Sequence, residues 1–131
     1  MTNDELHELH SMYLERRHLS TIEHTEHFAV EAWPGYEDFT AEFVVYPWWG
    51  PEGGYQRKNS PSSPDVVQSI DDAEWFCLGS VRRDGCVNFK YNNRHGFIHD
   101  CSNPSDSHAE MWDTIWGMAI ALMPRLEDIS R

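Results

Sequence analysis

Histidines are the residues that first suggest chemistry in this 131-residue chain, because there are eight of them. Two pairs are spaced three residues apart: His7 with His10, and His24 with His27. On a helix this spacing puts two imidazoles on one face, where Glu5 or Glu8 would add a carboxylate ligand. The spacing lacks the Glu-containing His-x-x-x-His arrangement of zinc proteases and fixes no third ligand. We therefore expect solvated histidines on an acidic surface, and we predict no metal ion and no cofactor.

Three cysteines form a second candidate group: Cys77, Cys86 and Cys101. Their number is odd and their spacing is not that of a zinc motif, so the sequence predicts free thiols and no disulfide framework. His99 and Cys101 alternate onto one face of an expected strand, and a site with two thiols and one imidazole would form if Cys86 lay opposite. Because free cysteines are usually buried as small apolar side chains, we expect these to be structural.

Motifs of nucleophilic and phosphate-binding enzymes are absent from the sequence. It contains no Gly-x-Ser-x-Gly and no glycine-rich phosphate loop. A thiol–imidazole nucleophile would also need electropositive surroundings and an oxyanion pocket, which no pattern here indicates. The sequence therefore favours a protein that is not an enzyme, and it points to no catalytic residue. A small metal-dependent or Cys/His enzyme is the alternative, built on His24, His27, His99 and Cys101.

The most distinctive segment covers residues 46–55. After Tyr46 it sets three more large aromatic residues among prolines and glycines, which cannot continue a strand: Trp48, Trp49 and Tyr55. Trp and Tyr side chains dominate the hot spots of protein interfaces. The segment therefore predicts either a partner-binding loop or an aromatic plug that folds back over the open end of a sheet.

Charge is the clearest signal in the composition, since 22 Asp and Glu against 10 Lys and Arg give a formal net charge of −12. Residues 1–47 hold ten of these acids and only two arginines, so the N-terminal third is the electronegative pole. Such a surface repels nucleic-acid backbones and anionic lipids, which argues against direct nucleic-acid binding and against membrane association. It favours a basic protein surface as the partner. The acids expected to contact that surface are Glu5, Glu8, Glu15, Glu37 and Asp38.

The length and the 40% hydrophobic content predict a single domain spanning residues 1–131. The longest nearly uncharged stretch towards the C-terminus, residues 114–124, is much shorter than the roughly 20 apolar residues of a membrane span. The chain opens with acidic residues rather than with the cations and apolar run of a signal peptide. We expect a soluble, cytoplasmic protein, and the sequence leaves its oligomeric state open.

Periodicity predicts a helix at the N-terminus and two strands after it. Residues 3–17 contain neither Gly nor Pro, and at helical spacing they carry Leu6, Leu9, Tyr13 and Arg17. Residues 26–33 and 39–46 change to a two-residue alternation, and Pro34-Gly35 interrupts the pattern between them. They predict two neighbouring antiparallel strands.

The middle of the chain is rich in turn-forming residues. Residues 47–64 carry four prolines and three glycines, which predicts a long irregular loop. Ser63-Pro64-Asp65 favours a helical turn through Val66, Val67 and Ile70, because Pro is accepted at the first helical position.

A hairpin is expected after this loop. Residues 75–81 and 86–91 predict its strands, with Gly85 in the left-handed position that closes the turn. A further turn then leads to a strand over 96–101. One register of this pairing sets Cys86 opposite Cys101, and a shift by one residue would separate them.

The C-terminal region predicts a second helix. Ser107 and Glu110 form a capping-box pattern at its start. The apolar stripe that follows at helical spacing consists of Trp112, Ile115, Trp116, Ala119, Leu122 and Met123. We expect Trp112 and Trp116 in the core, and we expect the helix to stop at Pro124.

This order of elements predicts an α+β fold, with a mostly antiparallel sheet of about five strands and an N-terminal and a C-terminal helix packed on it. With the acidic surface, it favours a small protein-interaction module. We expect an inhibitor or neutraliser of a basic, nucleic-acid-handling partner, such as a toxin-immunity protein or a phage-encoded antagonist of a host complex. A second alternative is a subunit of a larger assembly that buries Trp48, Trp49 and Tyr55 against its neighbours.

Overall fold

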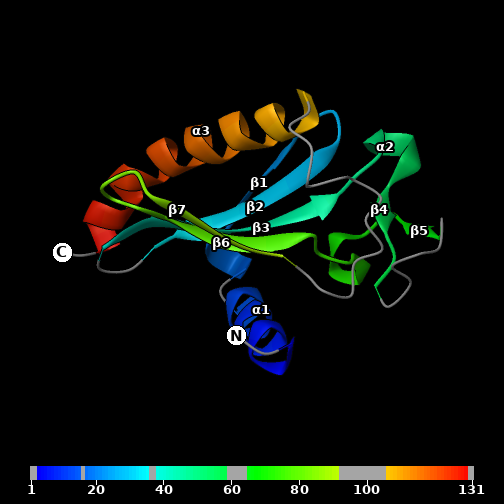
Figure 1. Cartoon of the computed structure of the whole chain (residues 1–131), viewed down its shortest axis with the longest axis horizontal. Helices are drawn as coiled ribbons and strands as arrows, with labels where there is room; N and C mark the ends of the chain where they lie inside the picture. Colours follow the sequence, from blue (N-terminus) through cyan, green and yellow to red (C-terminus); the bar gives the residue numbers. More distant parts are fainter. Residues whose placement is uncertain (1–2, 16, 36–37, 59–64, 92–105, 130–131) are drawn as a thin grey trace.

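A computed structural model describes residues 3–15, 17–35, 38–58, 65–91 and 106–129. Its centre is a five-stranded antiparallel sheet in the strand order β1-β2-β3-β6-β7. These strands span, in that order, Thr21–His24, Phe28–Pro34, Phe39–Pro47, Cys77–Arg82 and Val87–Tyr91. Helix α1 (Asn3–Glu15) precedes the sheet and helix α3 (Asp106–Ile129) follows it (Figure 1). The predicted α+β fold is therefore confirmed.

Helix α3 covers one face of the sheet and lies mainly along β2 and β3 (Figure 1). Alternate residues of these strands point towards the helix, because successive side chains of a strand face opposite sides. Burial of their apolar surface against α3 holds the helix in place. The main members of this first core are Phe28, Val30, Phe43, Val45, Met111, Ile115, Met118 and Leu122.

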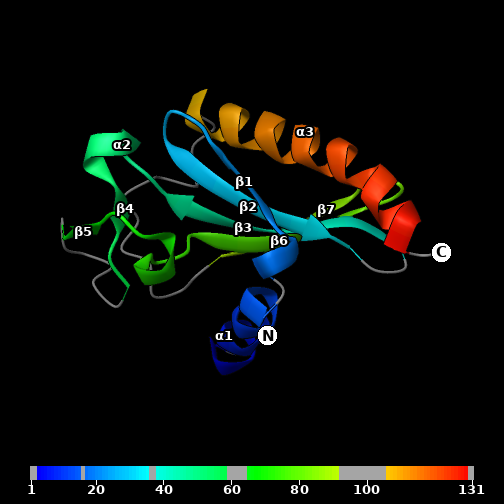
Figure 2. The same ribbon diagram turned by 180° about the vertical axis from the view of Figure 1, so that it is seen from behind.

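A second core fills the opposite face of the sheet. It contains Ala29, Trp33, Val44, Tyr46, Tyr55, Ala73, Trp75 and Leu78. Helix α1 lies on this side of the sheet (Figures 1 and 2), and its His10 ring stacks on Trp75 with the ring centroids 5.3 Å apart. Because both faces are covered, β2 is buried at every position.

The hairpin formed by β6 and β7 agrees with the prediction. Val81 pairs with Val87 at the end of the ladder, and the turn is closed by a hydrogen bond of 3.0 Å from the Gly85 N–H to the Arg82 carbonyl. Gly85 has a φ of +93°, which a residue with a Cβ rarely adopts. The turn thus depends on glycine at this position.

The fifth strand of the sheet differs from the one expected. Strand β1 pairs with β2 at one edge of the sheet, with Thr21 opposite Ala32, and no strand was expected for these residues. All four residues of β1 are exposed, so the strand carries no alternation of apolar and polar residues by which it could be recognised. The expected strand at 96–101, with His99 and Cys101, lies outside the described residues.

The helix expected in residues 3–17 is present as α1 with an earlier end, whereas the expected loop at 47–64 contains regular structure. Helix α1 ends at Glu15, and Arg17 belongs to a separate 3₁₀ turn, Arg17–Leu19, because its side chain turns towards the sheet. The expected irregular loop contains a one-turn helix, α2 (Gly50–Gly53), and a short strand, β4 (Tyr55–Gln56). The Tyr55 ring is buried, and this packing holds strand β4 in place although glycines precede it.

The expected helical turn after Pro64 was wrong. Val66–Val67 form strand β5, which pairs with β4, and a 3₁₀ turn follows at Ile70–Asp72. The backbone hydrogen bonds that Val66–Val67 would have made within a helix are made with β4 instead. Ladder pairing with β4 therefore outweighed the local helix signal.

Three expectations for α3 are corrected. The helix begins at Asp106, so Ser107 lies inside it, and it continues through Pro124 to Ile129. Pro124 has no N–H to donate to the carbonyl of Ile120, a residue on the exposed side of the helix. Trp116 lies on the flank of the helix and is 37% exposed. Its ring lies beside Gly85, where an added Cβ would be 3.6 Å from it. Trp112 is half-buried against Phe89, with centroids 4.8 Å apart.

Among the described helices, none combines the length and the apolar character that a membrane crossing requires.

Candidate functional site

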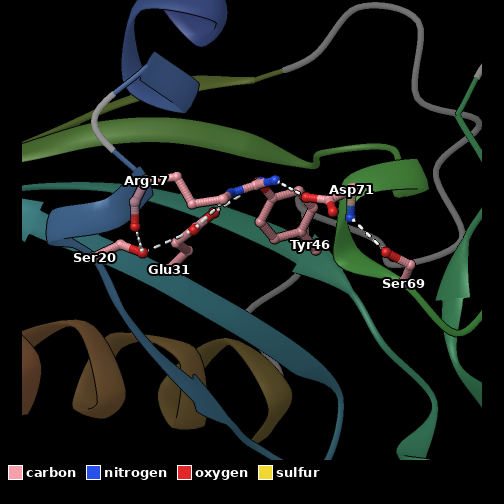
Figure 3. Close-up of polar contacts among 6 residues, drawn as sticks. All are labelled: Arg17, Ser20, Glu31, Tyr46, Ser69 and Asp71. Atoms are coloured by element: carbon pink, nitrogen blue, oxygen red, sulfur yellow. Dashed lines mark hydrogen bonds and ion pairs between the residues drawn. The ribbon is translucent and has the colours of Figure 1, made fainter.

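A buried carboxylate lies on the face of the sheet opposite α3 (Figure 3). Glu31 on β2 is fully buried, and alternation along the strand points it away from α3. Arg17 reaches it with two hydrogen bonds, Nε to Oε2 at 2.9 Å and Nη2 to Oε1 at 3.1 Å. Ser20 Oγ donates to the same carboxylate at 2.9 Å, and the Tyr46 hydroxyl donates at 3.2 Å. The carboxylate is therefore fully paired, as a buried charge must be.

Arg17 also joins this carboxylate to a distant surface turn. Its Nη1 forms an ion pair with Asp71 in the 3₁₀ turn Ile70–Asp72 (Figure 3). Ser69 Oγ caps that turn by accepting a 3.2 Å hydrogen bond from the Asp71 N–H. The arrangement ties the segment after α1 to the centre of the sheet and to the chain before β6. Its chemistry is that of a structural ion pair.

Ionisation of the network follows from burial and charge. Burial raises the pKa of Tyr46 well above its ordinary value, and the negative charge of Glu31 raises it further. Burial lowers the pKa of Arg17, but the hydrogen bond and the charge of Glu31 more than offset this and leave the pKa raised. Tyr46 therefore stays neutral and Arg17 stays charged over the physiological range.

The aromatic segment singled out from the sequence lies against the second core. Tyr55 is only 7% exposed, and its hydroxyl is 2.7 Å from His24 Nε2. The His24 ring in turn lies against Trp48, with centroids 4.4 Å apart. Trp49 is half-buried, and its backbone N–H donates to the Gly54 carbonyl at 2.9 Å. The arrangement is that of an aromatic plug with Trp48 and Trp49 partly open to solvent.

The acids of α1 form a stripe on its outer face. Asp4, Glu5, Glu8 and Glu15 are all exposed. With 3.6 residues per turn, Asp4, Glu8 and Glu15 lie within about 40° of one another around the helix axis, and His10 lies about 140° away. Since His10 is the position where α1 meets Trp75, helical geometry turns the stripe away from that contact. Of the acids predicted for binding, Glu8 and Glu15 lie on this line together with Asp4, whereas Glu5 lies about 80° from Glu15.

The remaining acids predicted for binding lie elsewhere. Asp38 is exposed in the connection between β2 and β3, where its carbonyl accepts a 2.8 Å hydrogen bond from the Arg83 N–H. Glu37 lies outside the described residues. The two predicted groups of acids are therefore not shown to form one surface, and α1 carries the continuous part.

Three arginines of the described chain form internal ion pairs. Arg57 Nε is 2.6 Å from Asp65 Oδ2, and Arg82 Nε is 3.6 Å from Asp84 Oδ2. Arg17 is committed to Glu31 and Asp71. Among these internal ion pairs of the described residues, none involves Asp4, Glu8 or Glu15. The negative potential of α1 is thus directed to solvent.

Histidines predicted as possible ligands are dispersed by the fold. His10 is buried on Trp75, and His24 lies between Trp48 and Tyr55. The side chain of His7 and the whole of His99 lie outside what the structure describes. Among the histidines placed here, His27 meets a carboxylate, because its Nδ1 is 3.3 Å from Glu110 Oε2.

Glu110 is a functional candidate that sequence reasoning missed. Its Oε1 accepts a 2.8 Å hydrogen bond from the Glu26 backbone N–H instead of capping its own helix, so the predicted capping box was wrong. The partners are more than 80 residues apart in the chain, and no local pattern signals such a contact. The Ser107–Glu110 spacing pointed to the wrong partner.

Comparisons of the chain with protein-family models, with curated proteins and with solved structures gave no match. Function therefore has to be inferred from the geometry of this molecule alone.

Proposed function

We propose that this protein is an acidic protein-interaction module that binds a basic protein surface through helix α1. More specifically, we propose an inhibitor or neutraliser of a basic, nucleic-acid-handling protein in the cytoplasm, of the kind that toxin-immunity proteins and phage-encoded antagonists exemplify. A free exposed thiol at Cys86 is compatible with that reducing compartment.

The observation that carries this proposal is the acidic stripe on α1. Asp4, Glu8 and Glu15 lie on one line of a helix that projects from the body of the protein (Figures 1 and 2). A projecting helix can enter a partner's groove without rearrangement of the sheet. Carboxylates on its leading face then meet the cations that a nucleic-acid-binding surface uses to contact phosphate.

An apolar side chain lies beside this stripe. Met12 is 53% exposed, and helical geometry places it about 60° from Glu15, between that residue and Glu5. Methionine adapts to irregular contact surfaces and is frequent at protein interfaces. Interfaces commonly surround such an apolar centre with a charged rim. The α1 face thus combines long-range attraction with a contact that excludes water.

Charge steering is the mechanism by which the stripe would act. Complementary potentials raise association rates to about 10⁸ M⁻¹s⁻¹ or more at low salt. Internal pairing of Arg17, Arg57 and Arg82 keeps these cations from cancelling the field of α1. The stripe would therefore recruit a basic partner faster than a neutral surface of the same shape.

Affinity capture with two charge-matched variants tests the proposal. The first replaces the stripe with D4N, E8Q and E15Q. The second, a control, replaces three exposed acids on other elements with E23Q, E52Q and D113N. Both variants lose the same formal charge. Capture of a basic protein by the wild-type chain and the control, with loss in the stripe variant, would support the proposal.

Other outcomes distinguish the alternatives. Equal loss in both variants would mean that only net charge matters, and equal retention would move the interface away from α1. If capture instead fails in a W48A/W49A variant while the stripe variant binds, the aromatic segment is the interface. That result would favour the alternative of a subunit held in a larger assembly.

A further inference from the structure

Three potential metal ligands meet where the turn between β1 and β2 touches the start of α3. Glu26 and His27 lie in that turn, and Glu110 comes from the helix. One ligand atom from each side chain lies within 4.8 Å of the other two. Glu26 is exposed and the other two are partly buried, so an ion from solvent can reach all three. The stripe on α1 has no part in this cluster.

The spacing of the two partly buried ligands matches a metal site. His27 Nδ1 and Glu110 Oε2 are 3.3 Å apart, which is longer than the 2.7–2.9 Å of a charge-assisted hydrogen bond. Two donors bound about 2.05 Å from a tetrahedral zinc ion lie about 3.3 Å from each other. The side chains therefore already stand at the separation that a shared metal ion would impose. The exposed Glu26 carboxylate has an oxygen within 4.8 Å of a ligand atom of each of the other two, and it would have to move closer to share the ion.

The surrounding hydrogen bonds hold this arrangement in place. Thr25 Oγ1 accepts hydrogen bonds from the N–H groups of Phe28 at 2.8 Å and His27 at 3.2 Å, which fixes the turn. The Glu26 N–H binds Glu110 Oε1 at 2.8 Å and leaves Oε2 directed at the imidazole. Such outer contacts orient ligands in established metal sites.

We propose that Glu26, His27 and Glu110 bind a divalent transition-metal ion of the zinc class. One imidazole nitrogen and two carboxylate oxygens suit such an ion, and the remaining coordination positions are left for water. The bound ion would link the start of α3 to the β1–β2 turn. It would replace the long His27–Glu110 contact with two metal–ligand bonds.

Zinc titration of the full chain, purified without a histidine tag, tests this proposal by calorimetry and by thermal unfolding. The site variant is H27Q/E110Q, and the matched control is H18Q/E23Q, which removes one exposed histidine and one exposed carboxylate outside the cluster. We expect one zinc equivalent on the wild-type chain and on the control. We expect at least about a tenfold weaker affinity in the site variant, because even the loss of outer-shell support costs 10–100-fold.

Thermal unfolding separates a lost ligand from a lost fold. Zinc should raise the melting temperature of the wild-type chain and the control, because an ion that binds only the folded state stabilises it. The single variant H27Q retains the bond between Glu110 and the Glu26 N–H, so it should melt like the wild type without zinc and gain nothing from zinc. Wild-type affinity in H27Q/E110Q, equal loss in the control, or no zinc effect on the wild-type chain would overturn the proposal.

Discussion

Arg17 binds the buried carboxylate of Glu31 with two hydrogen bonds, Nε to Oε2 at 2.9 Å and Nη2 to Oε1 at 3.1 Å. The carboxylate is fully buried, whereas the Arg17 side chain is 26% exposed. A charge in the centre of a sheet is tolerated only while its partner is present. This pair therefore determines whether the chain after α1 stays on the sheet.

Loss of the arginine should be strongly destabilising. Arg17→Met leaves Glu31 buried without its cation, and we expect the free energy of unfolding to fall by about 3–5 kcal/mol. Arg57→Met removes a half-exposed pair with Asp65 and should cost less than about 1 kcal/mol. Urea denaturation of both variants measures the difference. Similar costs for the two would mean that the Glu31 pair contributes no more than a surface pair.

Alkaline stability should depend on Tyr46. The pKa of its hydroxyl is raised in the folded state by burial and by Glu31, so folding favours the neutral phenol. Its contribution is complete below the unfolded value of about 10 and is lost as pH rises above it. Unfolding free energies measured from pH 8 to pH 11 should fall more steeply for the wild type than for Tyr46→Phe. Parallel profiles would contradict the prediction.

Acid stability should depend on Glu110. Its pKa is lowered in the folded state, so the ionised form favours folding. This contribution is complete above the unfolded value of about 4.3 and is lost as pH falls through the folded value. The stability difference between the wild type and Glu110→Gln, measured in metal-free buffer, should therefore shrink between pH 6 and pH 3. A difference independent of pH would rule out this role of the carboxylate.

Two glycines should respond to alanine with opposite signs. Gly85→Ala keeps only ordinary contact with Trp116 at 3.6 Å, but its φ of +93° should cost about 1–2 kcal/mol. Gly117 lies within α3, and a Cβ added there would meet nothing within 4 Å, so Gly117→Ala should stabilise by about 1 kcal/mol. Thermal and urea unfolding report both effects. Destabilisation by Gly117→Ala would show an unrecognised requirement at that position.

The salt dependence of association tests the α1 stripe directly. Once the basic partner is captured, its association rate with the wild-type chain should fall steeply between low and high salt, because exposed charges are screened within about 8–10 Å near physiological ionic strength. For the variant D4N/E8Q/E15Q we expect a slower rate at low salt and a flatter dependence. A wild-type rate that changes little with salt would rule out charge steering.

Much of the fold could be predicted because its signals are local. Gly85 closes the β6–β7 hairpin with a positive φ, as its place between the two expected strands predicted. Strands β2 and β3 were found from the two-residue alternation of residue types in the sequence. Strand β1 could not be found in this way, because all its residues are exposed and its pairing is specified by β2. An exposed edge strand of this kind forms because of its hydrogen bonds to the neighbouring strand, which the sequence of the edge strand alone does not reveal.

The candidate sites were harder to predict because they join distant segments. Arg17 continued a helical pattern in the sequence, yet its side chain is held by Glu31 and Asp71, 14 and 54 residues away. Glu110 matched a capping box, yet it binds the β1–β2 turn. In both cases a long-range ion pair or hydrogen bond outweighed a weak local preference. The α1 acids were predicted as exposed carboxylates because their environment is solvent.

The separation of the two cores by the sheet has a spectroscopic consequence. Trp33 and Trp75 are buried on one side, whereas Trp112 and Trp116 lie on the helix that covers the other. Fluorescence of Trp33 and Trp75 therefore reports on the second core, whereas that of half-buried Trp112 and exposed Trp116 reports on the α3 side of the sheet. Variants that retain one pair at a time would reveal whether the two sides lose their tertiary packing in a single cooperative step or one after the other.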